Sequence, residues 1–175
     1  VHPRRLRQGS IQRAAWATSR HLGQRTSAQT LSEALVASCL VEEDTTLRLE
    51  ASLVRLRVRQ PFFGALALFI DYHIDDSIPT ACTNGRWIRF NPKFAASINS
   101  AELDGVMVHE LLHAALRHSE RRGERKPEIW NIAADIVING MIREINGLKL
   151  PFKPVEDHWL KDLEVEEVYD RLIEY

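Results

Sequence analysis

The sequence His109-Glu110-Leu111-Leu112-His113 places two histidines four residues apart, with a glutamate directly after the first. Residues four apart lie on one face of a helix, so both imidazoles can reach the same cation. Glu110 lies about 100° further around such a helix, from where its carboxylate can reach a water on the ion without binding the ion itself. Spacing and residue types therefore predict a zinc site with His109 and His113 as ligands and Glu110 as general base.

A zinc ion that takes part in catalysis needs a third protein ligand and one open position. Asp135 is the favoured candidate, because it forms one polar stripe with Asn131 and Asn139 in an otherwise apolar segment. A buried carboxylate is easier to account for beside a cation than alone, and its alternative role is to orient an imidazole. His118 is the second candidate, although no glycine turns the chain before it, and it can bind only if the helix ends early.

Both patterns also have purely structural interpretations. The two histidines could belong to an ordinary core or solvated helix, and Asn131 and Asn139 could join helices through hydrogen bonds. Against the first interpretation, the residues that flank the motif are apolar and imply burial, where an imidazole without a partner is costly. A carboxylate-bridged di-iron site needs two Glu-x-x-His pairs, and no second pair follows Glu110-x-x-His113.

The pattern of apolar residues and breakers predicts a mostly helical chain. Helices are expected over residues 11–21, 28–41, 47–58, 103–116, 128–145 and 165–172. Ser100 is the expected cap of the helix that carries the motif, and Pro127 opens the one that carries Asp135. The run that ends at Ile74 alternates like a strand, although a helix that reaches Leu68 fits its first part. Together with a second strand at Trp87–Phe90, it predicts a small antiparallel sheet.

Three segments between Thr80 and Ile142 have a family likeness: TACTNGRWIRFNPKF, VMVHELLHAALRHSERRG and WNIAADIVINGMI. They resemble the predicted bacterial zincin-like metallopeptidase domain that is found ahead of von Willebrand factor A-like domains. LEVEEVYDRLI is similar to that family's closing helix, so the resemblance covers roughly the last 95 residues. It implies peptidase activity, with the roles of the motif at His109, Glu110 and His113 and a downstream acidic position at Asp135.

The fold class expected from these features is α+β: one mostly helical, zincin-like domain over residues 1–175, with a small antiparallel sheet and an HExxH helix. Residues 80–145 form its metal-site core. Residues 1–32 form a basic helical segment with six arginines and no acid, which is typical of a solvated helix, a transit peptide or a nucleic-acid-binding arm.

Composition places the chain among ordinary folded proteins, with 45% hydrophobic and 27% charged residues. The longest apolar run, residues 62–70, is far shorter than the roughly 20 residues of a membrane-spanning helix, so no membrane partner is expected. The two cysteines, Cys39 and Cys82, form no CxxC pair and fit a reducing, cytoplasmic location better than a disulfide framework.

The expected function is zinc-dependent hydrolysis of peptide bonds in a protein or peptide substrate, with Glu110 moving the proton from water to the leaving amine. His118, Arg117 or a tyrosine could stabilise the oxyanion. Trp87–Phe90 could be an edge strand that pairs with the substrate, or equally an ordinary core strand. One alternative is a non-catalytic, metal-stabilised scaffold that works with a partner ATPase or a von Willebrand factor A-like protein. Another is a nucleic-acid-associated module that uses the basic N-terminus. Glu110 argues against a scaffold, because a structural site needs no general base.

Overall fold

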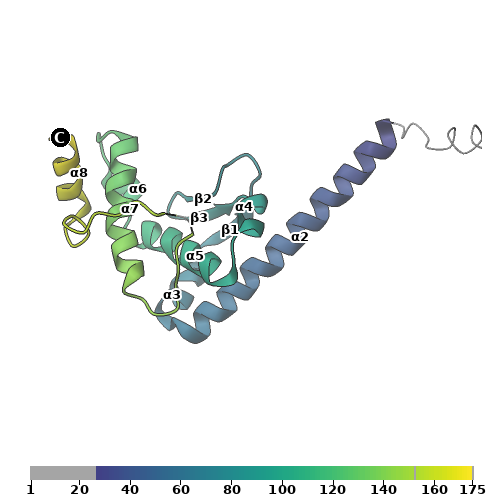
Figure 1. The fold of residues 1–175 in the computed structure, drawn as a ribbon, viewed down its shortest axis with the longest axis horizontal. Coiled ribbons are helices and arrows are strands. Elements are labelled where there is room, and N and C mark those ends of the chain that lie inside the picture. The colour runs from purple at the N-terminus through teal and green to yellow at the C-terminus, as the bar shows by residue number, and fades with distance from the viewer. Residues whose placement is uncertain (1–26, 152, 175) are drawn as a thin grey trace, which may run out of the picture. The chain divides into compact units, whose positions relative to one another are not determined.

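The computed structural model describes residues 27–151 and 153–174 (Figure 1). The chain separates into two units, residues 1–39 and 40–175. In the first unit the described part is the beginning of helix α2 (Ser27–Arg59), where residues 30–39 are exposed. The helix expected over 11–21 and the six arginines of the basic segment lie outside the described residues. No helix in the described part of the chain has the length and apolarity to cross a membrane.

Helix α2 is one continuous helix, whereas the sequence predicted two with a break near residues 42–46. That stretch contains no glycine or proline, and the hydroxyls of Thr45 and Thr46 donate to the carbonyls four residues earlier, so they remain in the helix. In the second unit, Leu49, Ser52 and Leu56 form the buried face of this helix.

The segment after α2 is helical for longer than the predicted strand allowed. Helix α3 (Pro61–Leu66) and the 3-10 turn η1 (Ala67–Phe69) come first, and strand β1 occupies only Asp71–Ile74. The interpretation of a helix that reaches Leu68 is therefore correct for the first part of the run. Pro61 explains the new helix, since proline fits the first turn, where its missing N–H is not needed.

The sheet has three strands in the order β1-β3-β2, formed by β1, β2 (Ala81–Thr83) and β3 (Trp87–Phe90). β3 pairs in parallel with β1 and antiparallel with β2, so the sheet is mixed and the prediction of an antiparallel sheet was wrong in this respect. The chain crosses from β1 to the far edge at β2 before the turn at Gly85 returns it to the middle. Gly85 has a φ of 91°, a conformation that glycine adopts without strain.

Of the five described helices after the sheet, three were predicted and two short ones were not. Those bounded as expected within a few residues are α5 (Ser100–Ala115), α7 (Pro127–Arg143) and α8 (Val165–Ile173). The short helices α4 (Pro92–Ser97) and α6 (His118–Arg121) were not predicted. The cap of α5 is Asn99 rather than Ser100, in a reciprocal capping box with Glu102.

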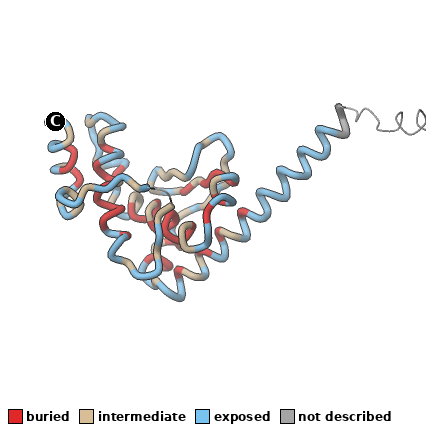
Figure 2. The backbone as a smooth tube through the Cα atoms, in the orientation of Figure 1, coloured by how far each residue is buried: buried red, intermediate tan, exposed pale blue. Residues whose placement is uncertain are grey.

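Two buried clusters hold the motif helix and its neighbour in place (Figure 2). The first includes Leu103, Met107 and Leu111 of α5 together with Ile88 and Phe90 of β3. The second joins one face of α7 to α8 around Trp130, Val168 and Tyr169. Ile138 and Ile142 of α7 belong to the first cluster as well, so α7 packs in both clusters and is held beside α5. The α+β class predicted from the sequence is confirmed.

Candidate metal centre

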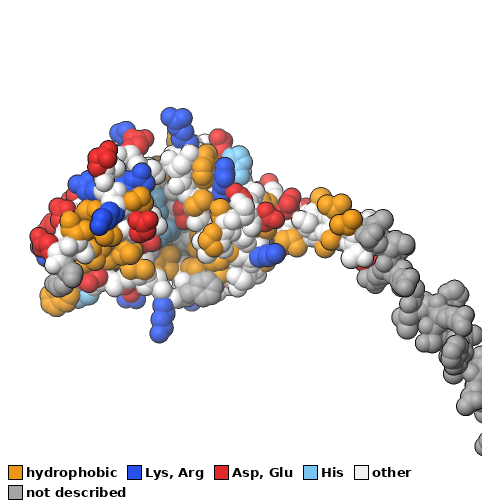
Figure 3. All heavy atoms as spheres, turned by 90° about the horizontal axis from the view of Figure 1, so that it is seen from above, with side chains coloured by type: hydrophobic (Ala, Val, Ile, Leu, Met, Phe, Trp, Pro, Cys, Tyr) orange, Lys and Arg blue, Asp and Glu red, His pale blue; other side chains and the backbone are white. Residues whose placement is uncertain are grey.

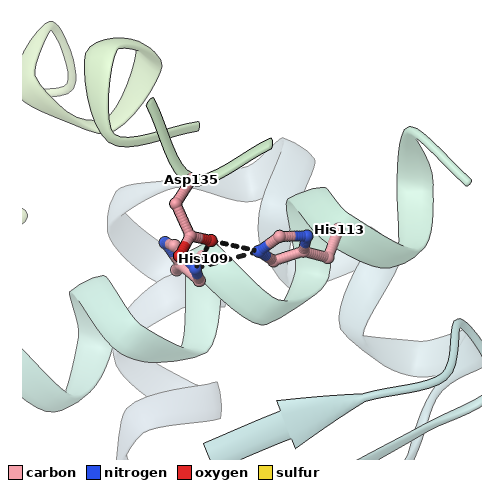
Figure 4. Close-up of side chains that lie close together, drawn as sticks. All are labelled: His109, His113 and Asp135. Carbon is pink, nitrogen blue, oxygen red and sulfur yellow. Dashed lines mark hydrogen bonds and ion pairs between the residues drawn. The ribbon is translucent and has the colours of Figure 1, made fainter. Parts of the chain in front are cut away.

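Helices α5 and α7 bring the three predicted ligands together (Figure 4). The Oδ1 atom of Asp135 lies 3.1 Å from Nε2 of His113 and 3.3 Å from Nε2 of His109. The two Nε2 atoms are 3.0 Å apart. Between 12% and 26% of each side chain is exposed, so the three metal-binding atoms are shielded but reachable from solvent. These three residues, His109, His113 and Asp135, are called the donor group below.

These residues fit a zinc ion by donor type and by spacing. Two imidazole nitrogens and one carboxylate oxygen are a ligand set of catalytic zinc sites, which keep a further position open. Ligands about 2.0–2.1 Å from a tetrahedral ion stand roughly 3.3 Å from one another. The donor separations of 3.0 to 3.3 Å are close to that value, so His109, His113 and Asp135 could hold one such ion.

Asn139 fixes the orientation of the first imidazole. Its side-chain nitrogen donates to the carbonyl of Val155 over 2.8 Å, so its oxygen faces Nδ1 of His109 at 3.0 Å. An amide oxygen only accepts, and Nδ1 of His109 must therefore carry the proton. When the ring is neutral, that tautomer leaves the lone pair of His109 on Nε2, on the side of Asp135 and His113. Asn139 is thus part of a hydrogen-bond network, as its structural interpretation held, whereas Asn131 is exposed at the surface.

His118 is buried and contacts the imidazole of His113 on the side of that ring away from Asp135. Helix α5 ends at Ala115, and Arg117 takes a left-handed conformation with a φ of 56°, so the chain turns sharply without a glycine. Nδ1 of His118 lies 3.1 Å from Nδ1 of His113, on the opposite side of the ring from Asp135. The helix therefore ends before His118, which was the condition for His118 to be a metal ligand. Even so, among the described residues His118 is not part of the donor group.

Asp135, His109 and His118 have shifted pKa values. Burial raises the pKa of Asp135, but its hydrogen bonds to the two histidines outweigh this and lower that pKa to about 2. Asp135 is therefore an anionic metal-binding group at neutral pH. Burial lowers the pKa of His109, and the hydrogen bond and charge of Asp135 together with the charge of Glu110 reverse the shift, so the pKa is raised. Burial, with His113 and Arg121, lowers the pKa of His118 to about 4.

Glu110 lies beside the donor group but outside it. Its side chain is buried, and that burial raises its pKa above the ordinary value for a glutamate. A carboxyl with a raised pKa is a better proton acceptor than an exposed one. The residue can therefore exchange a proton at a position next to the three donors, which is the chemistry of a general base.

A cleft of about 600 Å³ opens over the centre, and Figure 3 shows histidine side chains in a recess of the surface. Its walls include His109, Glu110, His113, His118, Asn131 and Asp135, and also Thr80, Ala81, Cys82, Thr83, Ser119, Arg122, Pro127, Glu128 and Trp130. Arg117 forms an ion pair with Glu120 and does not line the cleft. No tyrosine among the described residues lines it either. Of the residues considered for the oxyanion, only His118 lines the cleft.

Strand β2 forms one side of this cleft. Of the two interpretations of Trp87–Phe90, the edge strand was wrong and the core strand is correct. β3 lies in the middle of the sheet, and β1 and β2 are its two edges; β2 is the edge that lines the cleft. The backbone N–H of Asn91 donates to the carbonyl of Thr80, and Cys82 lies opposite Arg89 in the same ladder. Hydrogen-bonded positions alternate along an antiparallel pair, so Ala81 and Thr83 present their backbone groups to the free edge. The turn at Asn84-Gly85 was the signal in the sequence that a strand precedes it.

Residues 44–174 match the family described as "Putative metallopeptidase domain", and the chain belongs to that family. This match confirms the resemblance to a metallopeptidase domain. It begins at residue 44, so it covers most of the second unit and not only the segment from Thr80. Membership implies a metal and peptidase activity as a class. The association with a von Willebrand factor A-like domain stays a prediction. No curated protein and no solved structure matches the chain significantly.

Proposed function

We propose that this protein is a zinc-dependent peptidase, in which His109, His113 and Asp135 hold the ion and Glu110 is the general base. One observation carries the proposal: three metal-ligand donors within 3.3 Å of one another share a cleft with a buried glutamate. A cleft that is open to solvent favours hydrolysis over a closed structural site, which would need four protein ligands and no base.

A bound zinc ion would supply Lewis acidity, which makes a water easier to deprotonate and a carbonyl easier to attack. Glu110 would accept the proton of the attacking water and return it to the nitrogen of the leaving amine. Asp135, ionised at neutral pH, contributes the negative charge that two neutral imidazoles lack. Asn139 holds a proton on Nδ1, so the neutral His109 ring has its lone pair on Nε2, directed toward the ligand position.

The substrate would bind as an extended peptide along β2. The free edge of a sheet offers an unpaired row of backbone donors and acceptors, and an extended segment can satisfy them as an added strand. Ala81 and Thr83 have that orientation, and both line the cleft that contains Glu110. Recognition through the backbone of β2 predicts cleavage of unfolded or flexible protein segments rather than of compact folded domains.

Removal of the metal should abolish cleavage. We expect the full chain with one equivalent of zinc to cut an unfolded protein or a peptide mixture, with new amino termini detected by mass spectrometry. Adding 1,10-phenanthroline should stop the reaction, and a small excess of zinc should restore it. The isomer 1,7-phenanthroline, which does not chelate, is the control. Cleavage that persists at full rate in the chelator would contradict the proposal.

A further inference from the structure

The second metal-facing imidazole has a partner that differs from that of the first. His109 is held by an amide oxygen, but Nδ1 of His113 faces the Nδ1 atom of another histidine, His118, at 3.1 Å. Two nitrogens at this distance form a hydrogen bond only if one carries a proton and the other a lone pair. The contact therefore links the tautomers of the two rings.

The direction of this bond follows from the opposite side of the His113 ring. Nε2 of His113 lies 3.1 Å from Asp135 and 3.0 Å from Nε2 of His109, within the donor group. When Nε2 binds a metal it must be unprotonated, and the proton of a neutral imidazole is then on Nδ1. In that state His113 donates through Nδ1 and His118 accepts.

The fold holds His118 in this position from several sides. Arg117 adopts the left-handed conformation, which is uncommon for a residue with a side chain and is often found at functional sites. The indole nitrogen of Trp130, from α7, donates to the carbonyl of His118 over 2.8 Å. The His118 residue is only 4% exposed. A buried imidazole held by a strained turn has little freedom to leave the acceptor position.

We infer that His118 is a positioning residue for the metal centre: its Nδ1 accepts the proton of His113 Nδ1 and so directs Nε2 of His113 to the ion. The inference rests on the proposed zinc site, and it gives His118 a role different from that of third ligand or oxyanion donor. Loss of such a hydrogen bond behind a ligand typically weakens metal binding by about 10–100-fold.

Two substitutions separate the hydrogen bond from the packing of the side chain. His118→Phe keeps a ring in the buried space but removes the acceptor, whereas His118→Asn keeps an acceptor oxygen near the place of Nδ1. We expect zinc affinity, measured on the full chain by competition with a chromophoric chelator, to fall about 10–100-fold in His118→Phe and to recover largely in His118→Asn. His158→Asn, at an exposed histidine, is the control and should bind zinc like the parent.

A spectroscopic measurement on the parent protein needs no variant to fold. Two-bond proton–nitrogen correlations of the zinc-loaded, nitrogen-15-labelled chain should show His113 protonated at Nδ1 and bound to the metal through Nε2. A His113 bound through Nδ1 would overturn the inference. Parent-like zinc affinity in His118→Phe, or equal losses in His118→Phe and His118→Asn, would also overturn it but leave the zinc site intact. Failure of the parent to bind zinc would overturn the proposed function itself.

Discussion

Replacing Glu110 by glutamine is expected to lower kcat/KM for peptide hydrolysis by about 10²–10⁴-fold, the range typical for loss of a general acid–base group. Glutamine has nearly the same shape but cannot accept a proton from water. Since Glu110 is not one of the three donors, zinc content should stay at the level of the parent. The measurement pairs peptide-cleavage kinetics with elemental mass spectrometry of the same sample.

The matched control for this variant is Glu128→Gln, because Glu128 lines the same cleft but is exposed at the start of α7. It makes the same chemical change without removing a buried base, so activity close to that of the parent is expected. Two results would contradict the assignment of Glu110: full activity in Glu110→Gln, or a similar loss in both variants. Loss of zinc from Glu110→Gln would indicate that the carboxylate binds the ion.

Replacing Asp135 by alanine should weaken zinc binding by more than about 100-fold, since loss of a ligand exceeds the 10–100-fold cost of losing a group behind one. The change removes the only carboxylate of the donor group among the described residues and leaves two imidazoles. It also removes the hydrogen bond and charge that raise the pKa of His109, so that histidine should titrate at lower pH than in the parent. Zinc affinity by chelator competition and histidine titration by NMR measure the two effects.

The control for Asp135→Ala is Asn131→Ala, one turn earlier on α7 and on the wall of the same cleft. Asn131 is exposed and outside the donor group, so its variant should bind zinc as the parent does. Unchanged affinity in Asp135→Ala would remove Asp135 as third ligand. If the His109 titration were also unchanged, the hydrogen bond that protonated His109 donates to Asp135 would be absent in solution.

The two helices that carry the centre were predictable because their signals are local. α5 and α7 are long, mostly apolar and bounded by a cap or a proline, and tertiary packing has little reason to override such segments. Asp135 stood out for the same reason, as one of three polar residues at helical spacing in an apolar helix. The class of fold and the residues of the donor group could therefore be expected before any contact was known.

The features that the sequence did not predict depend on contacts between distant segments or on rare backbone conformations. Arg117 turns the chain in a conformation that few residues other than glycine adopt. An arginine at this position therefore does not predict where His118 lies. Val155, the acceptor that orients Asn139, lies in an irregular segment 16 residues later. The parallel pairing of β1 with β3 follows from a crossover, and strand patterns do not specify which neighbour a short strand takes.

Two histidines of α5 and one aspartate of α7 are proposed to bind a single zinc ion. Anomalous diffraction from crystals of the zinc-loaded full chain, recorded on both sides of the zinc absorption edge, tests this proposal most directly. We expect one strong peak in contact with Nε2 of His109, Nε2 of His113 and Oδ1 of Asp135. A peak at other residues, or none near these three atoms in crystals that contain zinc, would contradict it.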